Sequence, residues 1–220
     1  MKNIISKKEK NHIDSICNKL DITDYTINND GSIDVDGNVD LYSRDLTELP
    51  LIFNKVSRHF DCSDNQLTTL KGCPKKIGGN FDCSYNKLTS LEYLSSSIIK
   101  GDINVSKNKL TNLIGSPRHA TDFECQHNFL TSLEGCPSHV DSLDCSNNDI
   151  TTFLYFPDTI NRLYFMNNSF NIFFLKTVKS LEYDEHLVFI KYLNHYDFWN
   201  PTFDKERFMD FIEDIKDGLR

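Results

Sequence analysis

The stretch Phe81-Asp82-Cys83-Ser84-Tyr85-Asn86-Lys87-Leu88-Thr89-Ser90-Leu91 is the clearest copy of a unit that occurs seven times between Val39 and Phe173. Its asparagine is the most regular member, and successive copies are spaced by 21, 22, 20, 20 and 20 residues: Asn65, Asn86, Asn108, Asn128, Asn148 and Asn168. Arg44 takes this place in the first unit. Repetition of a short unit at a near-constant period predicts a solenoid, in which each copy forms one rung and stacks on its neighbours.

Apolar residues stand at fixed offsets from this asparagine. The positions two and five residues after it are apolar in every unit, as Leu88 and Leu91 are in the quoted copy. The positions three and five residues before it alternate with polar ones, as Cys83 and Phe81 do. This alternation predicts a short strand with one buried face. Strands of successive rungs would pair in parallel about 4.8 Å apart and form one sheet along the stack.

The asparagine has a structural explanation in such a stack. Its amide can both donate to and accept from backbone groups of the turn that follows the strand, where the chain leaves the sheet. The segment that leads from this turn back to the next strand, which we call the return limb, carries Gly-Cys-Pro or a variant. Examples are Gly72-Cys73-Pro74 and Gly135-Cys136-Pro137. Glycine and proline favour a tight turn, and the limb is too short for a full helix. Turns or short 3₁₀ pieces are therefore expected there.

The repeat resembles the unit of leucine-rich repeat proteins, a strand of the form L-x-x-L-x-L-x-x-N-x-L. The form Asp-Cys-Ser-x-Asn-x-Leu-Thr-Ser-Leu-x-Gly-Cys-Pro is similar to members from bacteriophages and some bacteria. The likeness covers about 135 of the 220 residues and implies an α/β repeat fold, a leucine-rich repeat solenoid of about seven parallel-strand rungs. It departs at Arg44 and at Ser95-Ser96-Ser97, where a capping first rung and a bulged third loop are expected.

The chain ends predict caps on this solenoid, which gives the divisions 1–38, 39–174 and 175–220. Residues 6–20 form an amphipathic pattern behind the N-cap Ser6, and the turn 28–31 between two short alternating runs predicts a hairpin. After the repeats, helices are expected at 185–195, ended by Asn200-Pro201, and after the N-cap Asp204. The many aromatic residues of this end either cover the last rung or, around Trp199, form an exposed patch that docks a partner.

Composition narrows the function further. The net charge of −8 argues against direct binding to a nucleic-acid backbone and is compatible with a partner that carries a basic patch. No run of about 18 apolar residues is present to span a bilayer, and the first ten residues lack the apolar core of a secretory signal. Four of the seven cysteines (Cys62, Cys83, Cys125, Cys145) share one inward strand position. They are interpreted as small hydrophobic residues and free thiols of a cytoplasmic protein, whereas a zinc cluster would require CxxC spacing.

The strand residues that point away from the core should form one continuous concave face. At the position four residues before the repeated asparagine, this face carries an almost unbroken column of acidic side chains. This column either binds a basic partner or only keeps the sheet soluble. Calcium is a weak alternative because one column supplies too few oxygen ligands. The candidate partner-binding residues are Asp40, Tyr42, Asp61, Asp82, Tyr85, Asp102, Asp122, Glu124, Asp144, Arg162, Tyr164, Met166 and Trp199.

No arrangement of residues points to catalysis. His119 and His139 occupy equivalent positions and are expected to stack on the rim without a third ligand. No nucleophile with a supporting base and no nucleotide-binding motif is evident. The sequence therefore predicts a non-enzymatic protein-binding module without cofactor or metal; the alternative is a metal-dependent or catalytic protein that uses the histidine and acidic columns. The resemblance to phage proteins implies a partner in the cytoplasm of the bacterial host, such as a defence or metabolic enzyme that the module inhibits.

Overall fold

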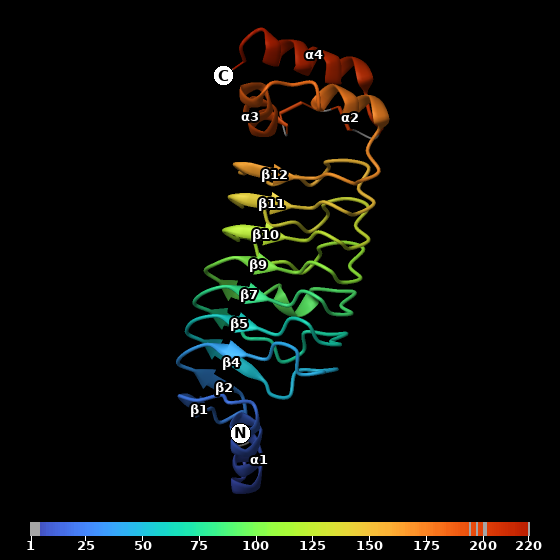
Figure 1. The fold of residues 1–220 in the computed structure, drawn as a ribbon. Coiled ribbons are helices and arrows are strands. Elements are labelled where there is room, and N and C mark those ends of the chain that lie inside the picture. The colour runs from blue at the N-terminus through green and yellow to red at the C-terminus, as the bar shows by residue number, and fades with distance from the viewer. Residues whose placement is uncertain (1–4, 194, 197, 200–201, 220) are drawn as a thin grey trace.

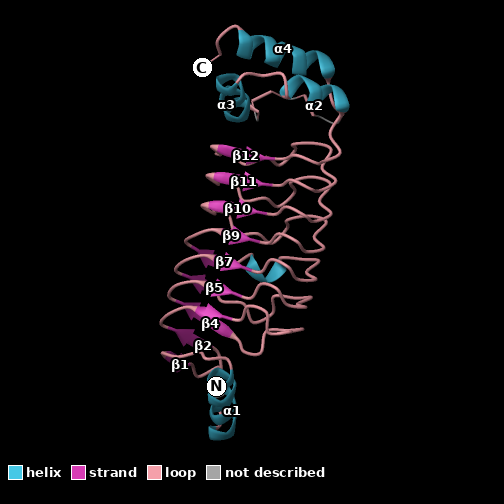
Figure 2. Ribbon diagram, viewed as in Figure 1, coloured by secondary structure: helices cyan, strands magenta, loops and turns pink. Residues whose placement is uncertain are grey.

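The computed structural model describes residues 5–193, 195–196, 198–199 and 202–219. They form a β-solenoid that is closed by one helix at its N-terminal end and by three helices at its C-terminal end (Figure 1). The expected stack of parallel rungs is confirmed. Figure 2 shows that the strands are short and that loops and turns make up much of each rung.

The strands before the asparagines form one sheet of seven, in the order β12-β11-β10-β9-β7-β5-β3. Every pair is parallel and in register, so that Phe60 lies beside Phe81 and Phe81 beside Ile103. In-register pairing stacks equivalent residues of all rungs in straight columns. The strands are β3 (Val39–Asp40), β5 (Phe60–Asp61), β7 (Phe81–Asp82), β9 (Ile103–Asn104), β10 (Asp122–Glu124), β11 (Ser142–Asp144) and β12 (Arg162–Tyr164).

A second sheet corrects the expectation for the return limbs. The limbs of the first rungs are strands that pair in parallel in the order β2-β4-β6-β8, with β1 antiparallel at the edge. Later limbs continue the pairing as single bridges, from His119 to His139 and from His139 to Thr159. A limb that runs beside another limb satisfies its backbone N–H groups by pairing, even where it is too short for a helix. The strands are β1 (Tyr25–Ile27), β2 (Ile33–Val35), β4 (Phe53–Val56), β6 (Lys76–Ile77) and β8 (Ile98–Ile99). The irregular third loop contains the one-turn 3₁₀ helix η1 (Glu92–Leu94).

The inward side chains of the two sheets share one core. Phe53 of β4 and Phe60 of β5 meet edge to face with ring centroids 5.1 Å apart. The strand cysteines are fully buried among such residues, as the interpretation as small hydrophobic residues requires. Burial raises the pKa of the Cys83 thiol well above its usual value, so the thiol stays protonated and unreactive. All seven cysteines are free.

The asparagine column ties each rung to the one before it. Asn86 donates from Nδ2 to the carbonyl oxygens of Cys62, Cys83 and Ser84 at 3.0–3.1 Å, and its Oδ1 accepts from the backbone N–H of Leu67 at 2.8 Å. Asn65, Asn108, Asn128, Asn148 and Asn168 make equivalent bonds. The expected structural role of the asparagine is therefore confirmed.

The N-terminal cap follows the sequence closely. Helix α1 (Lys7–Lys19) begins after Ser6, whose side chain and that of Glu9 form a reciprocal capping box. Its buried residues Ile13 and Cys17 join the core. The expected hairpin is β1-β2, and because β2 pairs with β4 it supplies the first strand of the second sheet. The guanidinium of Arg44 forms an ion pair with Asp21, 3.5 Å away, which links the first rung to this cap.

The C-terminal cap consists of α2 (Ile172–Val178), α3 (Tyr183–Tyr192) and α4 (Lys205–Lys216). Phe174 of α2 lies at the centre of an aromatic cluster that covers the last rung, with ring centroids 5.5 Å from Phe170 and 5.0 Å from Phe208. Phe189 is the buried residue of α3, whereas Leu187 on the same helix is exposed. Asp204 caps α4 as expected, whereas the expected break at Asn200-Pro201 lies outside the described residues.

The interpretation of Trp199 as part of an exposed docking patch is wrong. Its side chain is 7% exposed and packs between Phe170, Phe174 and Phe203, with ring centroids 5.0–5.9 Å away. An open last rung leaves apolar core uncovered, and burying large aromatic rings there is the strongest way to close it. None of the helices in the described ranges is long and apolar enough to cross a membrane.

Candidate partner-binding face

The outward side chains of the seven-stranded sheet form the candidate site. We call it the acidic face and define it by two columns of carboxylates. The strand column comprises Asp40, Asp61, Asp82, Glu124 and Asp144, and the entry column at the start of the strands comprises Asp102 and Asp122. In-register pairing brings these carboxylates together, with Asp40 beside Asp61, Asp61 beside Asp82, and Glu124 beside Asp144.

The strand column also has a structural function that the sequence did not reveal. The carboxylate of Asp61 accepts hydrogen bonds from the backbone N–H of Ser63 at 2.8 Å and from its hydroxyl at 2.6 Å. The backbone N–H two residues further on donates in the same way to Asp40, Asp82, Asn104 and Asp144. These are Asx turns, which satisfy a backbone donor where each strand ends. Because Asn104 does this as an amide, the turn requires the oxygen and not the negative charge.

The entry column forms a similar chain of bonds between rungs. The side chain of Asn38 accepts from the backbone N–H of His59, and that of His59 accepts from the N–H of Asn80. The side chain of Asn80 then accepts from the backbone N–H of Asp102 at 3.1 Å, and the carboxylate of Asp102 accepts from the backbone N–H of Asp122 at 3.3 Å. Polar side chains at the start of the strands therefore contribute to the stack.

The charge of the strand column is not fully compensated. Burial raises the pKa of Asp82, hydrogen bonds from Ser84 act in the opposite direction, and the charge of the neighbouring Asp61 adds to the rise. A carboxyl group with a raised folded-state pKa stabilises the fold below its unfolded pKa, and this contribution is lost as pH rises through the folded pKa. At neutral pH the ionised Asp82 is therefore a source of instability.

Replacing Asp82 by asparagine should stabilise the protein at neutral pH. The amide oxygen can keep the bond from Ser84, as Asn104 does with Ser106, and the repulsion from Asp61 disappears. We expect the free energy of unfolding to rise by roughly 0.2–1 kcal/mol at pH 7, and the gain to vanish near pH 3. Urea unfolding of both proteins at the two pH values measures this difference. Asp149→Asn removes an exposed charge whose side chain has no hydrogen bond or ion pair in the described part of the chain, so this control should change stability little. A variant less stable than the wild type at pH 7 would contradict the prediction.

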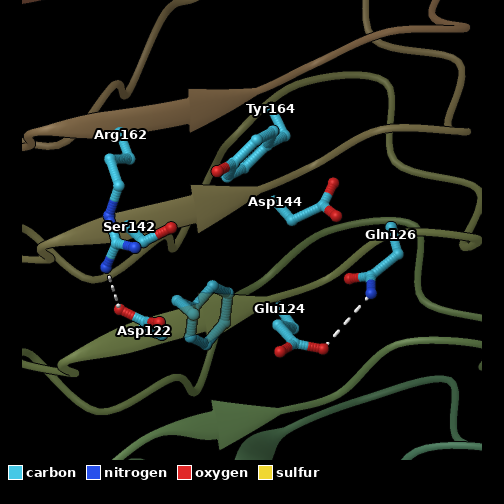
Figure 3. Close-up of a pocket in the computed structure, with 8 residues that line it drawn as sticks. Asp122, Glu124, Gln126, Ser142, Asp144, Arg162 and Tyr164 are labelled. Carbon is cyan, nitrogen blue, oxygen red and sulfur yellow. Dashed lines mark hydrogen bonds and ion pairs between the residues drawn. The ribbon is translucent and has the colours of Figure 1, made fainter.

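The C-terminal half of the acidic face contains an open hollow of about 240 Å³ (Figure 3). Its lining includes Asp122, Glu124, Asp144, Arg162 and Tyr164, which the sequence placed in the site. The guanidinium of Arg162 reaches across β11 to the carboxylate of Asp122, 3.2 Å away, and also to Asp141 at 2.8 Å. Hydrogen bonds from Asn161 and Arg162 lower the pKa of Asp141. The other carboxylates of the acidic face have no ion pair in the described residues.

Gln126 supplies a feature of the hollow that the sequence did not single out. Its Nε2 donates to Glu124 at 3.3 Å (Figure 3), whereas its Oε1 is buried and has no hydrogen-bond partner in the described part of the chain. A buried acceptor without a donor costs free energy in the free protein. The hollow thus presents carboxylates and one unused acceptor, and no exposed cation besides Arg162 lines it.

Exposed aromatic and apolar side chains accompany the carboxylates. Tyr42, Tyr85, Tyr164 and Met166 are each 44–54% exposed on this side of the sheet, whereas Trp199 is remote from it in the cap core. Tyr85 has a left-handed backbone with φ +52°, and the ammonium group of Lys107 lies 4.0 Å from its ring centroid. The position before the asparagine is left-handed in every rung, so only the presence of a bulky aromatic residue there is unusual.

The histidine pair lies on the other sheet. The rings of His119 and His139 are tilted with centroids 4.8 Å apart, which confirms the expected stacking. Within the described ranges no three His, Cys, Asp or Glu side chains are arranged to hold a metal ion.

The acidic face offers acceptors, negative charge and exposed tyrosines over seven rungs, which is chemistry suited to binding a cationic surface. Comparisons of the chain with protein-family models, with curated proteins and with solved structures found no match, so its function is inferred from the geometry of this face.

Proposed function

We propose that the chain is a non-enzymatic module that binds a protein with a basic patch through its acidic face. The observation that carries this proposal is the run of in-register carboxylates, of which Asp122 alone is paired with a cation in the described residues. Asx turns account for an oxygen at these positions, but an amide serves equally well, so they do not account for the charge. Retaining repulsive charges at such sites is explained if a partner supplies the missing cations.

The hollow around Gln126 supports the same proposal. A Lys or Arg side chain entering it would meet Glu124 and Asp144 and could donate to the unused Oε1 of Gln126. Tyr164 and Met166 border this end and supply the apolar contact area that protein interfaces concentrate at their centres. We place the centre of the binding surface here, on the last three rungs.

The resemblance of the repeat to phage-type leucine-rich repeat proteins adds a biological setting. It supports a partner in the cytoplasm of a bacterial host, and inhibition of a defence or metabolic enzyme by occlusion. This setting rests on the resemblance alone, because a fold shared by many proteins does not specify a function.

The test compares charge removal on and off the acidic face. Charge reversal to lysine would also abolish the Asx turns, so the informative variant is Asp61→Asn/Asp82→Asn/Asp144→Asn. The matched control, Glu134→Gln/Asp149→Asn/Asp158→Asn, makes the same change in net charge at exposed residues outside the face. We expect wild type and control to capture the same stoichiometric protein from bacterial lysate, and the face variant to lose at least about 90% of it, since each charge pair at an interface contributes on the order of 1 kcal/mol or more. Undiminished capture by a folded face variant would refute binding through the acidic face.

A further inference from the structure

The outer face of the second sheet carries the opposite charge. We call it the basic face and define it by six exposed side chains of the return limbs: Lys55, Arg58, Lys75, Lys76, Lys100 and Arg118. Lys55 lies beside Lys76 in register and Lys76 beside Ile98, and two later limbs pair through His119 and His139. The limbs 53–59, 74–80, 97–101, 117–121 and 137–140 contain no Asp or Glu. A chain with net charge −8 thus concentrates cations on one surface.

These cations have no ion-pair partner among the described residues. Carboxylates border the basic face on β2, where Asp34 is the register partner of Lys55 and Asp36 accepts a hydrogen bond from Ser57. The charge of Lys75 lowers the pKa of Asp30 at the same border, and Asp158 precedes Thr159 at the other. Between these borders the six cations lie on four successive limbs, which span about 14 Å at the usual strand spacing. Six like charges on a surface this small repel one another unless an anion is bound.

The acidic face does not cancel this surface. The inward side chains of the two sheets touch, as Phe53 and Phe60 do, so their outward side chains point in opposite directions. Packed sheets lie about 10 Å apart, and their outward charges are further apart still. At physiological salt the Debye length is about 8 Å, so an approaching ligand experiences the near face and little of the far one. Net charge is therefore a poor guide to what the basic face binds.

We propose that the basic face binds the phosphate backbone of a nucleic acid. Its cations recur with the rungs along a straight sheet, which suits a ligand whose charges also recur at a regular spacing. Two exposed apolar side chains, Ile52 and Ile98, lie near the basic face. The exposed tyrosines Tyr93 and Tyr155 lie in turns and are not part of the paired limbs. Protein interfaces depend on buried aromatic or apolar anchors, for which this surface offers only the two isoleucines, whereas phosphate contacts need only charge and hydrogen-bond donors. Binding is sequence-independent, because no element projects from the flat sheet to enter a groove.

The proposal is tested with a fluorescein-labelled DNA duplex of about 20 base pairs, by anisotropy at about 50 and 200 mM NaCl. We expect the full chain to bind it with micromolar affinity at the lower salt and to weaken at least tenfold, roughly, at the higher. Lys55→Gln/Lys76→Gln/Arg118→Gln should bind at least about tenfold more weakly and show a salt slope smaller by about 2–3. Lys55→Arg/Lys76→Arg keeps the charge and should bind as the wild type does.

The matched control is Lys10→Gln/Lys179→Gln/Lys216→Gln, which makes the same change in net charge at exposed residues of the caps. It should bind DNA nearly as well as the wild type. No binding by the wild type at low salt, or equal loss in control and face variant, overturns the proposal. A third outcome also overturns it: DNA does not bind, and sedimentation shows a salt-sensitive self-association that the basic-face variant abolishes. The basic face would then be occupied by the acidic face of a second copy.

Discussion

Replacing Gly135 by alanine is expected to lower the free energy of unfolding by about 4 kcal/mol, the sum of two effects of 1–3 kcal/mol each. The first is backbone strain, because Gly135 has φ +87°, a conformation that side chains disfavour. The second is a clash with backbone of the preceding rung: a Cβ atom would lie 2.3 Å from the nitrogen of Ile114 and 2.5 Å from the oxygen of Leu113. These backbone atoms are already held in their own turn, because the N–H of Ile114 donates to Asn112 and the carbonyl oxygen of Leu113 accepts from Ser116. They cannot move aside without breaking those bonds. Urea unfolding followed by circular dichroism measures the loss.

Gly218→Ala separates the two effects. Gly218 has a similar φ of +99°, but a Cβ atom there meets nothing within 4 Å. Its substitution should cost only the strain, about 1 kcal/mol. Equal losses at Gly135 and Gly218 would show that the close approach of the rungs is unimportant. The Gly-Cys-Pro turn is thus explained by how closely successive rungs approach each other, in addition to the shape of the turn.

Asn86→Ala is expected to destabilise the protein by about 3 kcal/mol, because unpaired buried polar groups cost 1–3 kcal/mol each and water can reach only part of the site. The substitution removes the donor to the carbonyl oxygens of Cys62, Cys83 and Ser84 and the acceptor for the N–H of Leu67. Asn86 is 8% exposed. The same unfolding experiment measures the effect, and hydrogen exchange at Leu67 should accelerate because its N–H loses its partner.

The control is Asn29→Ala, the same chemical change at an exposed asparagine of the hairpin turn, whose side chain has no hydrogen bond to any of the described residues. It should change stability by less than about 0.5 kcal/mol. If Asn86→Ala proved as mild as the control, the asparagine column would have to be a by-product of repetition, and the solenoid would depend on apolar stacking alone.

The two charged faces together define a molecule with two distinct binding surfaces. The proposals for them fail independently, since the acidic-face variants leave the return limbs untouched and the basic-face variants leave the strand column untouched. A protein partner on one side and a polyanion on the other would make the chain a bridge between them.

How far the sequence predicted the site can be judged from particular residues. The seven strands, the apolar columns, the role of Asn86, the Ser6 cap and the Asp204 cap follow from spacing and local chemistry. The columns of the acidic face follow too, because alternation along a strand assigns each residue to one face. The Asx turns at Asp61 and Asp144 could have been found from the recurrent Asp-x-Ser order. The burial of Trp199 could not have been predicted from the sequence, because it depends on how three helices pack on the last rung.

The sequence by itself determined that this protein stacks short rungs in register, because a period of 20–22 residues with a buried asparagine and fixed apolar positions has no other way to satisfy its backbone and cover its core. The tertiary structure alone decided that the return limbs pair into a second sheet and that lysines from separate rungs, such as Lys55 and Lys76, meet on its outer face. The physical reason is that net charge is a sum over the chain, whereas a ligand responds to the charges that folding places within a Debye length of it.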